Sequence, residues 1–463
     1  MKVVLTRPNY HSHLITPQLG LGYISSYLKA NGIETEIIDG LNHSLTNTEI
    51  ADRCASADLV GINCLSDYYP KVVELSRILK DRGKSVVVGG PQASVLPMET
   101  ITGTGADYVV VGEGEQTMLE LAEAIKEKKS TAMIQGLVTK GAQTFVKRPY
   151  LPDLDALPFP DWSQMRPSTY KKAPHGGFVK KFPVAPITST RGCPYECTFC
   201  ASPDIWGRRI RYRSPKNVVD EIELLVKGYG VKEIHFEDDN LTLKRSHVEG
   251  ICELILERKL NVSWATPNGI RVDTIDEKLL RLMKKSGCYF IAFGIESGNE
   301  SILKKIKKET DLATITHAVH EAKKVGLMTQ GFFIFGLPGE TERTVANSVE
   351  YAKSIPLDKA QFLLLDVLPG SQIWKDNKLK SLNSDSSKRS YQEVTWVPEG
   401  ISREALEKAP SKAFKSFFLR PKPILCALRF IKPSQIGFVI RRMADFGILP
   451  SFKSSNPNPA RRK

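Results

Sequence analysis

The sequence predicts an α/β protein in which a Rossmann-like open sheet is followed by a partial (β/α)6 TIM-type barrel and a small helical C-terminal region. Three observations predict this fold. Short apolar strands alternate with helical segments up to residue 126, and a second alternation of six strand–helix units begins near residue 184. A proline-rich stretch separates the two. Such alternation builds parallel sheets covered by helices, and 463 residues exceed one core of ordinary size.

The first alternation, which we assign to a domain spanning residues 1–135, predicts an open parallel sheet. Strands are expected over residues 3–6, 35–39, 59–64, 85–89 and 108–112, and helices over residues 21–30, 69–81 and 116–126. Open sheets of this kind bind ligands at the carboxyl ends of their strands. Three of those ends carry small or polar residues, namely Ser66, the run Gly89, Gly90, Pro91 and Gln92, and the run Gly112, Glu113 and Gly114. Three such loops on one edge favour a ligand over simple chain reversal.

Residues 136–183 are rich in proline and weakly periodic, which is typical of a connector between domains. The second alternation, residues 184–375, predicts strands over 184–190, 231–237, 262–268, 289–296, 328–336 and 360–368. Helices are expected between them, for example over 215–227, 277–285, 301–308 and 342–353. Six such units predict a partial barrel, whose site lies at the carboxyl ends of its strands.

The C-terminal region, residues 376–463, begins with a Ser/Lys-rich loop and continues with basic, aromatic and mainly helical segments, with a disordered end expected after residue 453. Residues 401–463 hold fourteen Lys or Arg against three acidic residues, so that this region carries most of the formal charge of +14. Its apolar face either packs on the barrel or lies on an anionic membrane surface. No nucleic-acid-binding module accompanies the charge, and we expect no nucleic-acid partner.

Three of the eight cysteines are clustered as Cys193, Cys197 and Cys200, directly after the first strand of the second alternation. Thiolates suit iron and zinc. A structural zinc needs a fourth ligand at finger-like spacing, and the nearest histidines, His175 and His235, do not offer a recognisable pair. Three thiolates on a [4Fe–4S] cluster leave one iron open to a further ligand. The spacing therefore favours an iron–sulfur cluster over zinc.

This run resembles the radical S-adenosylmethionine (radical SAM) superfamily, whose motif is C-x-x-x-C-x-aromatic-C, with Phe199 in the aromatic position. The resemblance implies that the open iron chelates S-adenosylmethionine, which yields a carbon radical after one-electron reduction by a donor such as a flavodoxin or ferredoxin. It implies a binding site at the strand ends. Its residues would be Phe199, Glu237 for the ammonium group, Arg271 for the carboxylate, Gly294, Glu296 and Ser297 for the ribose, and Gly336 near the adenine.

The N-terminal domain resembles that of the radical SAM branch with a cobalamin-binding domain. The resemblance is carried by the run Pro-x-Leu-Gly-Leu-Gly-Tyr at residues 17–23, Gly-Gly-Pro at 89–91 and Gly-Glu-Gly-Glu at 112–115. It implies a cobalamin held by Ser66, Gly89, Gly90, Pro91, Gln92, Gly112, Glu113 and Gly114. The chain departs from many cobalamin domains at residues 39–43, which lack the D-x-H-x-x-G motif whose His binds cobalt.

These resemblances imply a cobalamin-dependent methyltransferase acting on an unactivated carbon or phosphorus centre of a small-molecule or lipid-like substrate. The alternatives are a cyclase, oxidoreductase or rearrangement enzyme of the same family, and a cobalamin or redox sensor. A methylthiotransferase is disfavoured, because no second cysteine triad precedes the first. No apolar run approaches the ~18 residues of a membrane span, so we expect a cytoplasmic protein, with the basic region as its only candidate for peripheral membrane contact. His317 and His320 are expected to be solvated or packed.

Overall fold

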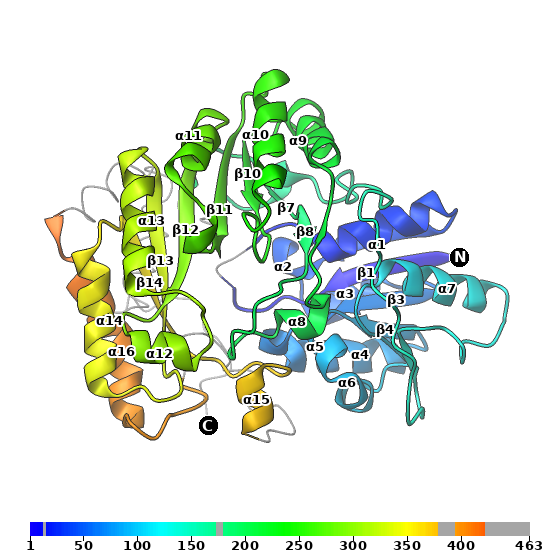
Figure 1. The fold of residues 1–463 in the computed structure, drawn as a ribbon. Helices are drawn as coiled ribbons and strands as arrows, with labels where there is room; N and C mark the ends of the chain where they lie inside the picture. Colours follow the sequence, from blue (N-terminus) through cyan, green and yellow to red (C-terminus); the bar gives the residue numbers. More distant parts are fainter. Residues whose placement is uncertain (13–14, 173–178, 378–393, 422–463) are drawn as a thin grey trace, which may run out of the picture.

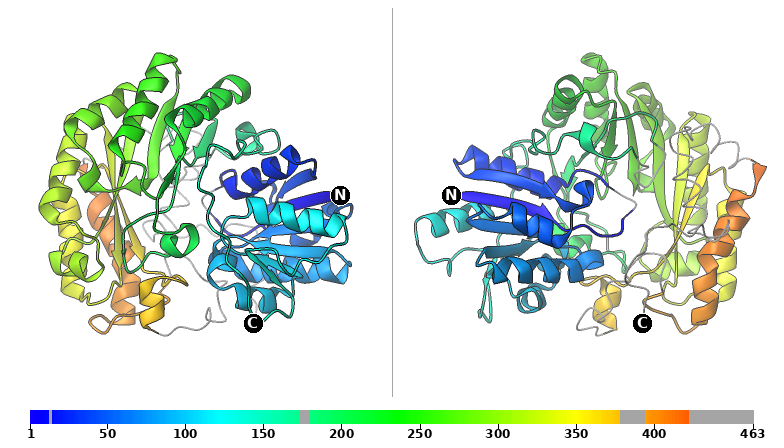
Figure 2. Two further views of the ribbon diagram at one scale, coloured as in Figure 1. Left: turned by 45° about the vertical axis from the view of Figure 1, so that its right-hand side comes forward. Right: turned by 180° about the vertical axis from the view of Figure 1, so that it is seen from behind.

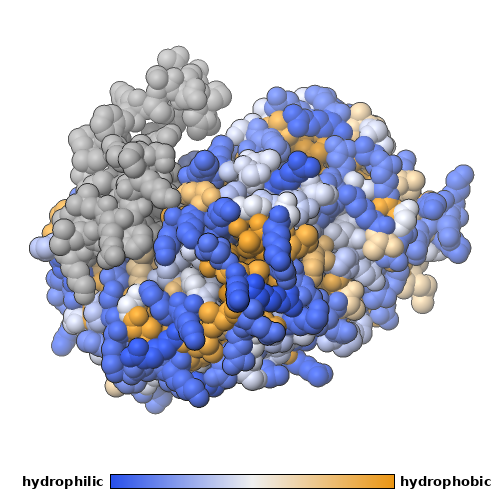
Figure 3. All heavy atoms as spheres, turned by 90° about the horizontal axis from the view of Figure 1, so that it is seen from above, coloured by the Kyte–Doolittle hydropathy of each residue, from blue (hydrophilic) through white to orange (hydrophobic). Residues whose placement is uncertain are grey.

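The computed structural model describes residues 1–12, 15–172, 179–377 and 394–421, which form two lobes built on two six-stranded sheets (Figure 1). Within these ranges, no helix is both long and apolar enough to cross a lipid bilayer. Seen from above, the surface is largely hydrophilic, with apolar side chains gathered near its centre (Figure 3).

The first sheet has the strand order β2-β1-β3-β4-β5-β6. Its strands are β1 (Lys2–Arg7), β2 (Glu34–Asp39), β3 (Leu59–Asn63), β4 (Ser85–Gly89), β5 (Tyr108–Val110) and β6 (Leu137–Thr139). All neighbours are parallel except β6, which pairs antiparallel with β5. The chain order reverses between β1 and β3, which is the place where open α/β sheets bind ligands.

Helices cover both faces of this sheet, as the sequence predicts. On one face, α1 (Leu19–Ala30) and α7 (Glu115–Lys126) pack on Val3 and Leu5 of β1. On the other, α3 (Asn47–Arg53) and α4 (Tyr69–Asp81) pack on Val4, and α6 (Pro97–Thr104) packs beside α4. Successive side chains of a strand point to opposite faces, so a continuous apolar strand supplies both cores. The short helices α2 (Gly40–His43) and α5 (Pro91–Val95) follow β2 and β4.

The second sheet is parallel throughout and open, with the order β14-β13-β12-β11-β10-β7. Its strands are β7 (Val184–Ile187), β10 (Glu233–Phe236), β11 (Ser263–Ile270), β12 (Cys288–Glu296), β13 (Met328–Phe335) and β14 (Lys359–Leu364). The helices line its outer side, as Figures 1 and 2 show. They are α9 (Pro215–Tyr229), α10 (Arg245–Glu257), α11 (Glu277–Lys285), α12 (Glu300–Lys305), α13 (Leu312–Lys324) and α14 (Glu342–Ser354). This is the predicted partial barrel.

Several elements end earlier than the sequence predicts, and for two of them the cause lies in the backbone. The strand expected over 184–190 stops at Ile187, because Thr190 and Arg191 form a separate short strand, β8, which pairs with β9 (Arg211–Tyr212). The helix expected over 301–308 stops at Lys305, because Lys307 adopts a left-handed backbone (φ 53°) that cannot continue a helix.

The described part of the C-terminal region packs on the barrel. Helix α15 (Gln372–Asp376) follows β14, and α16 (Arg403–Phe418) lies against β14 and α14 with Leu406, Ala413 and Phe417 buried. Residues 378–393 and 422–463 lie outside the described residues, and with them the expected loop and the expected disordered end.

Candidate active site

The three clustered cysteines lie on the loop between β8 and α8 (Ser202–Trp206), beyond the carboxyl end of β7. All three thiols are free and partly buried. The backbone N–H of Thr198 donates to the carbonyl of Ile306 (3.0 Å), and its carbonyl accepts from the N–H of Ile373 (3.0 Å). Gly192 has φ 100°, and a Cβ there would lie 2.7 Å from the carbonyl oxygen of Arg209. The loop is therefore held closely by the segment before β9, the end of α12 and α15.

Burial around the three thiols favours their neutral form, so thiolate ligands would depend on the positive charge of a bound metal centre. Burial raises the pKa of all three, that of Cys200 to about 12, whereas Arg271 opposes the shift at Cys193 and Cys197. The Arg271 guanidinium lies 3.6 Å from the centre of the Tyr195 ring. In the described chain, no three His, Cys, Asp or Glu side chains converge as a single metal ion requires. Three soft thiol donors without a fourth fit a [4Fe–4S] cluster with one open iron.

The end of β12 brings together three of the residues proposed for S-adenosylmethionine. Glu296 has a left-handed backbone (φ 67°), rare for a non-glycine residue, and its Oε1 lies 2.7 Å from Nζ of Lys308. A Cβ on Gly294 would lie 2.6 Å from that Oε1, so only glycine permits this approach. The Lys308 ammonium also lies 6.0 Å from the centre of the Phe199 ring. Ser297, by contrast, is buried, with its hydroxyl 3.3 Å from that of Ser348 in α14.

Sequence reasoning missed Lys308. It is largely buried and connects the cysteine motif with the end of β12. No local pattern marks it, because its partner Glu296 lies twelve residues earlier, across α12.

At the end of β10, the side chain of Asp238 is buried, whereas its neighbours Glu237 and Asp239 are more exposed. Its Oδ1 accepts hydrogen bonds from the backbone N–H and hydroxyl of Ser189 (3.0 and 2.8 Å) and from the Thr190 hydroxyl (2.6 Å), and burial raises its pKa to about 6. Glu237 is partly exposed, and Asp239 accepts from the hydroxyl of Ser202 just beyond Cys200. The strand end thus supports the cysteine loop and leaves Glu237 accessible.

Two further residues proposed for S-adenosylmethionine are held by protein contacts. Arg271 pairs with Asp273 (2.8 Å) and donates to the carbonyls of Lys308 and Glu309 (both 2.8 Å), in addition to its contact with Tyr195. Gly336, at the end of β13, has φ 91°.

The turn after Gly336 is closed by a buried carboxyl group that sequence reasoning did not single out. Oε2 of Glu340 accepts from the backbone N–H groups of Gly336 (2.6 Å) and Leu337 (3.1 Å). Its Oε1 has no hydrogen-bond partner among the described residues, and burial raises the pKa of Glu340 to about 7. His317 and His320 are exposed on α13, as expected.

The proposed cobalamin residues line the edge of the first sheet. Gly90 has φ 109°, and a Cβ there would lie 2.8 Å from the carbonyl oxygen of Cys64, so the loop after β4 follows Gly89 and crosses closely over the end of β3. The Ser66 hydroxyl donates to Oε1 of Gln92 (2.6 Å), and Pro91 begins α5. These contacts join the loops after β3 and β4 into one rim.

Some residues of the loop after β5 lie at the rim, and others are buried in the interior. Gly112 has φ 78°, and a Cβ there would meet no atom within 4 Å, which leaves space for a ligand to approach the backbone. Gly114 packs against Ile24 of α1, and both carboxylate oxygens of Glu113 are engaged by protein donors, Arg211 and the backbone N–H of Leu151 among them. The close crossing at Gly90 and the open backbone at Gly112 give this rim a low profile, which suits a large flat ligand such as cobalamin.

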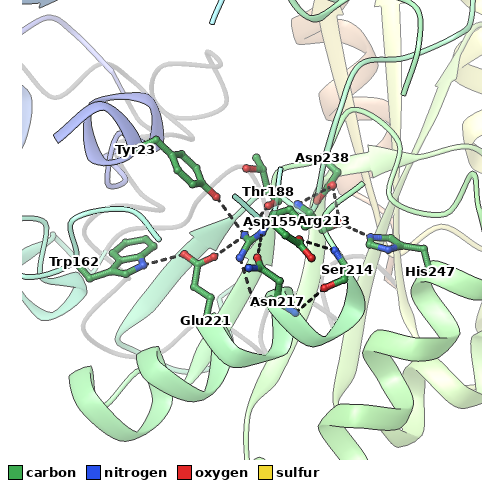
Figure 4. A network of polar contacts seen from close by, with 11 residues as sticks. Tyr23, Asp155, Trp162, Thr188, Arg213, Ser214, Asn217, Glu221, Asp238 and His247 are labelled. Atoms are coloured by element: carbon green, nitrogen blue, oxygen red, sulfur yellow. Dashed lines mark hydrogen bonds and ion pairs between the residues drawn. The ribbon is translucent and has the colours of Figure 1, made fainter. Parts of the chain in front are cut away.

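The two rims meet. Helix α5, after β4, packs against α8, which follows the cysteine motif (Figure 1). Tyr23 of α1 accepts a hydrogen bond from Arg213 (3.2 Å), which pairs with Glu221 (2.6 Å), and Trp162 of the connector donates to the same carboxylate (2.9 Å), as Figure 4 shows. Polar contacts from the first sheet and the connector thus fix the carboxyl ends of both sheets next to one another.

Comparisons with known proteins agree with this architecture. Residues 10–122 match the family model for the B12 binding domain, and residues 187–352 match that for the radical SAM superfamily. The chain is 32% identical to an uncharacterised methyltransferase of Pyrococcus horikoshii, over 96% of this chain and 97% of that protein. It is 29% identical to the cytidylyl-2-hydroxyethylphosphonate methyltransferase of Streptomyces wedmorensis, over 78% of each chain.

Two further similarities widen the comparison. The chain is 28% identical to the anaerobic magnesium-protoporphyrin IX monomethyl ester cyclase of Rubrivivax gelatinosus, over 90% of this chain and 78% of that one. Its fold is similar to that of the radical S-adenosylmethionine methyltransferase TsrM from Kitasatospora setae, solved with cobalamin and a [4Fe–4S] cluster (TM-score 0.69, 20% identity, 94% and 92% covered).

Proposed function

This chain belongs to the radical SAM superfamily, in the branch with an N-terminal B12-binding domain, and we propose that it is a cobalamin-dependent methyltransferase. Its cofactors are a [4Fe–4S] cluster, S-adenosylmethionine and cobalamin. It methylates an unactivated carbon or phosphorus centre of a small-molecule or lipid-like substrate, with a flavodoxin or ferredoxin as electron donor. The relatives that carry methyltransferase names support this proposal.

One observation carries the proposal: α8, which directly follows Cys200, packs against α5, which begins at the glycine loop after β4 of the first sheet. Methyl transfer to a radical requires both cofactors to reach one substrate. When bound, the cluster supplies the electron that cleaves one S-adenosylmethionine, and cobalamin carries a methyl group taken from another.

The chain's own residues would bind the cofactors and orient them toward the substrate. The three thiols would hold the cluster. The Glu296–Lys308 pair lies at the carboxyl end of β12, near the ring of Phe199. Ala265, Phe290, Ala292 and Met328 form an apolar cluster with Phe332, mostly in the first half of the strands and below the carboxyl ends where the site lies.

The test uses the full chain, reconstituted anaerobically with iron, sulfide and cobalamin and reduced with dithionite in the presence of S-adenosylmethionine alone. We expect two products: 5′-deoxyadenosine from cleavage, and S-adenosylhomocysteine from methyl transfer to reduced cobalamin. A Cys193→Ala, Cys197→Ala, Cys200→Ala variant is the matched control, because it loses the cluster ligands and retains the first sheet. It should form S-adenosylhomocysteine only.

The same assay separates the alternatives. A cyclase, which the relative from Rubrivivax gelatinosus favours, would release 5′-deoxyadenosine without S-adenosylhomocysteine. A sensor would release neither product. Either result would overturn the methyltransferase proposal.

A further inference from the structure

We propose that Glu113 and Glu115 are positioning residues for the cysteine loop, and that they act through Arg191. The N-terminal domain thereby sets where the cluster lies relative to the glycine rim. This inference rests on the proposed function, because it takes Cys193, Cys197 and Cys200 as cluster ligands.

The first support is a buried ion-pair network between the domains. Arg191 precedes Cys193 by two residues, and its two terminal nitrogens lie 2.7 Å from Oε1 of Glu113 and 2.7 Å from Oε1 of Glu115. Arg211, paired with Arg191 across β8 and β9, lies 2.8 Å from both oxygens of Glu113. All four side chains are at most 8% exposed, and their charges balance.

The second support is the place of the Arg191 guanidinium. It lies 5.1 Å from the ring centre of Tyr23 in α1 and 5.3 Å from that of Trp206 at the end of α8. One side chain therefore contacts the first domain and the helix beyond Cys200, while its own backbone enters the loop before Cys193. Moving the glutamates moves both ends of the cysteine loop.

The third support is that the preceding residues are held by the barrel itself. The carbonyl of Thr188 accepts from Arg213 (3.0 Å), as Figure 4 shows. Asp238 accepts hydrogen bonds from the hydroxyls of Ser189 and Thr190. Arg191 is the next residue, and both of its ion-pair partners come from the other domain. The start of the cysteine loop is thus fixed by the cobalamin domain as well as by the barrel.

A merely cohesive contact would not need four buried charges. Desolvating two ion pairs is costly, and apolar side chains of similar size often stabilise a protein as well. Bidentate, charge-assisted hydrogen bonds instead fix direction and distance. This property matters for a loop whose metal must face a second cofactor.

The test compares Glu115→Gln with a matched control, Asp161→Asn. Asp161 also joins the connector to α1, through Lys29 (2.6 Å) and Ser25 (2.8 Å), and among the described residues its hydrogen bonds and ion pairs involve none of the cysteine loop. Two readouts are used: amide hydrogen exchange of residues 190–206 in the cluster-free protein, and the electron paramagnetic resonance spectrum of the reduced cluster with and without S-adenosylmethionine.

For Glu115→Gln we expect exchange over residues 190–206 to be at least about tenfold faster, because the hydrogen bond from Arg191 loses its charged acceptor. We also expect unchanged iron content and shifted g-values. Arg191→Lys keeps the charge and loses one of the two ion pairs, and it should shift both readouts in the same direction. It replaces Glu115→Gln in the test if that variant does not fold.

The inference is refuted if Glu115→Gln and Arg191→Lys match the wild type in both readouts, or if Asp161→Asn reproduces their changes. These results differ from a failure of the proposed function. If the wild-type protein takes up no iron, the proposed function fails, and the exchange experiment still decides whether the glutamates order the loop.

Discussion

Replacing Glu340 by glutamine should change how the stability of the barrel depends on pH. Glu340 is fully buried behind the turn at Gly336, and one of its oxygens accepts two backbone N–H groups. Burial raises its pKa from 4.5 to about 7. The neutral glutamine keeps an oxygen that can accept the same N–H groups and removes the titration.

The size and sign of the change in the free energy of unfolding follow from the linkage between proton binding and folding. Between pH 4.5 and about 7, the Glu340 carboxyl is ionised in the unfolded chain and protonated in the folded one. The folded state binds the extra proton, so the free energy of unfolding falls as pH rises through this window. The shift of the pKa from 4.5 to about 7 is equivalent to about 3 kcal/mol. Above pH 7 this contribution is constant.

The assay is urea unfolding of the cluster-free wild type and Glu340→Gln at pH 5, 6, 7 and 8, followed by tryptophan fluorescence. All five tryptophans lie at residue 162 or later, so the signal reports on the connector and barrel and not on the first sheet. The stability of the wild type relative to the variant should fall by about 2.5 kcal/mol between pH 5 and pH 8. Asp238 titrates in both proteins and cancels in the difference. Parallel pH profiles would refute the reasoning.

Gly90→Ala should cost about 2–4 kcal/mol and weaken cobalamin binding measured by absorbance, because φ 109° is a glycine-only conformation and the new Cβ would approach the Cys64 carbonyl. Gly83→Ala, with φ 69° and no atom within 4 Å, should cost only about 1–2 kcal/mol, and equal losses would contradict the account of the rim. Glu221→Gln should cost about 3–5 kcal/mol in urea unfolding, because it leaves the Arg213 guanidinium buried without its countercharge. If Glu221→Gln lowered the free energy of unfolding by less than about 1 kcal/mol, the Arg213–Glu221 pair would contribute no more than an exposed salt bridge does.

The order of elements and the place of the cysteine loop could be predicted because both depend on local sequence. The apolar strands, the Ser214 cap before α9 and the spacing of Cys193, Cys197 and Cys200 need no distant partner. Once strands alternate with helices, the rule that ligands meet the carboxyl ends of parallel strands places the loops of both domains on the functional edge.

The roles of individual charged residues could not be predicted in this way, because they depend on partners far along the chain. Glu113 looks like a loop residue of the cobalamin rim, yet it lies 78 residues from Arg191 and 98 from Arg211, which engage its carboxylate. Tyr23 and Arg213 are 190 residues apart. Burial turns such residues inward, and burial is decided by the packing of the two lobes.

The pairing of residues 113 and 115 with residues 191 and 211 also constrains how this gene can change over generations. A substitution that removes the charge at one of the four positions leaves an uncompensated charge in the buried interface. Changes of charge on one side are therefore expected to need a matching change on the other. Joining a barrel with these arginines to a foreign N-terminal domain without the carboxylates would bury two cations that have no countercharge.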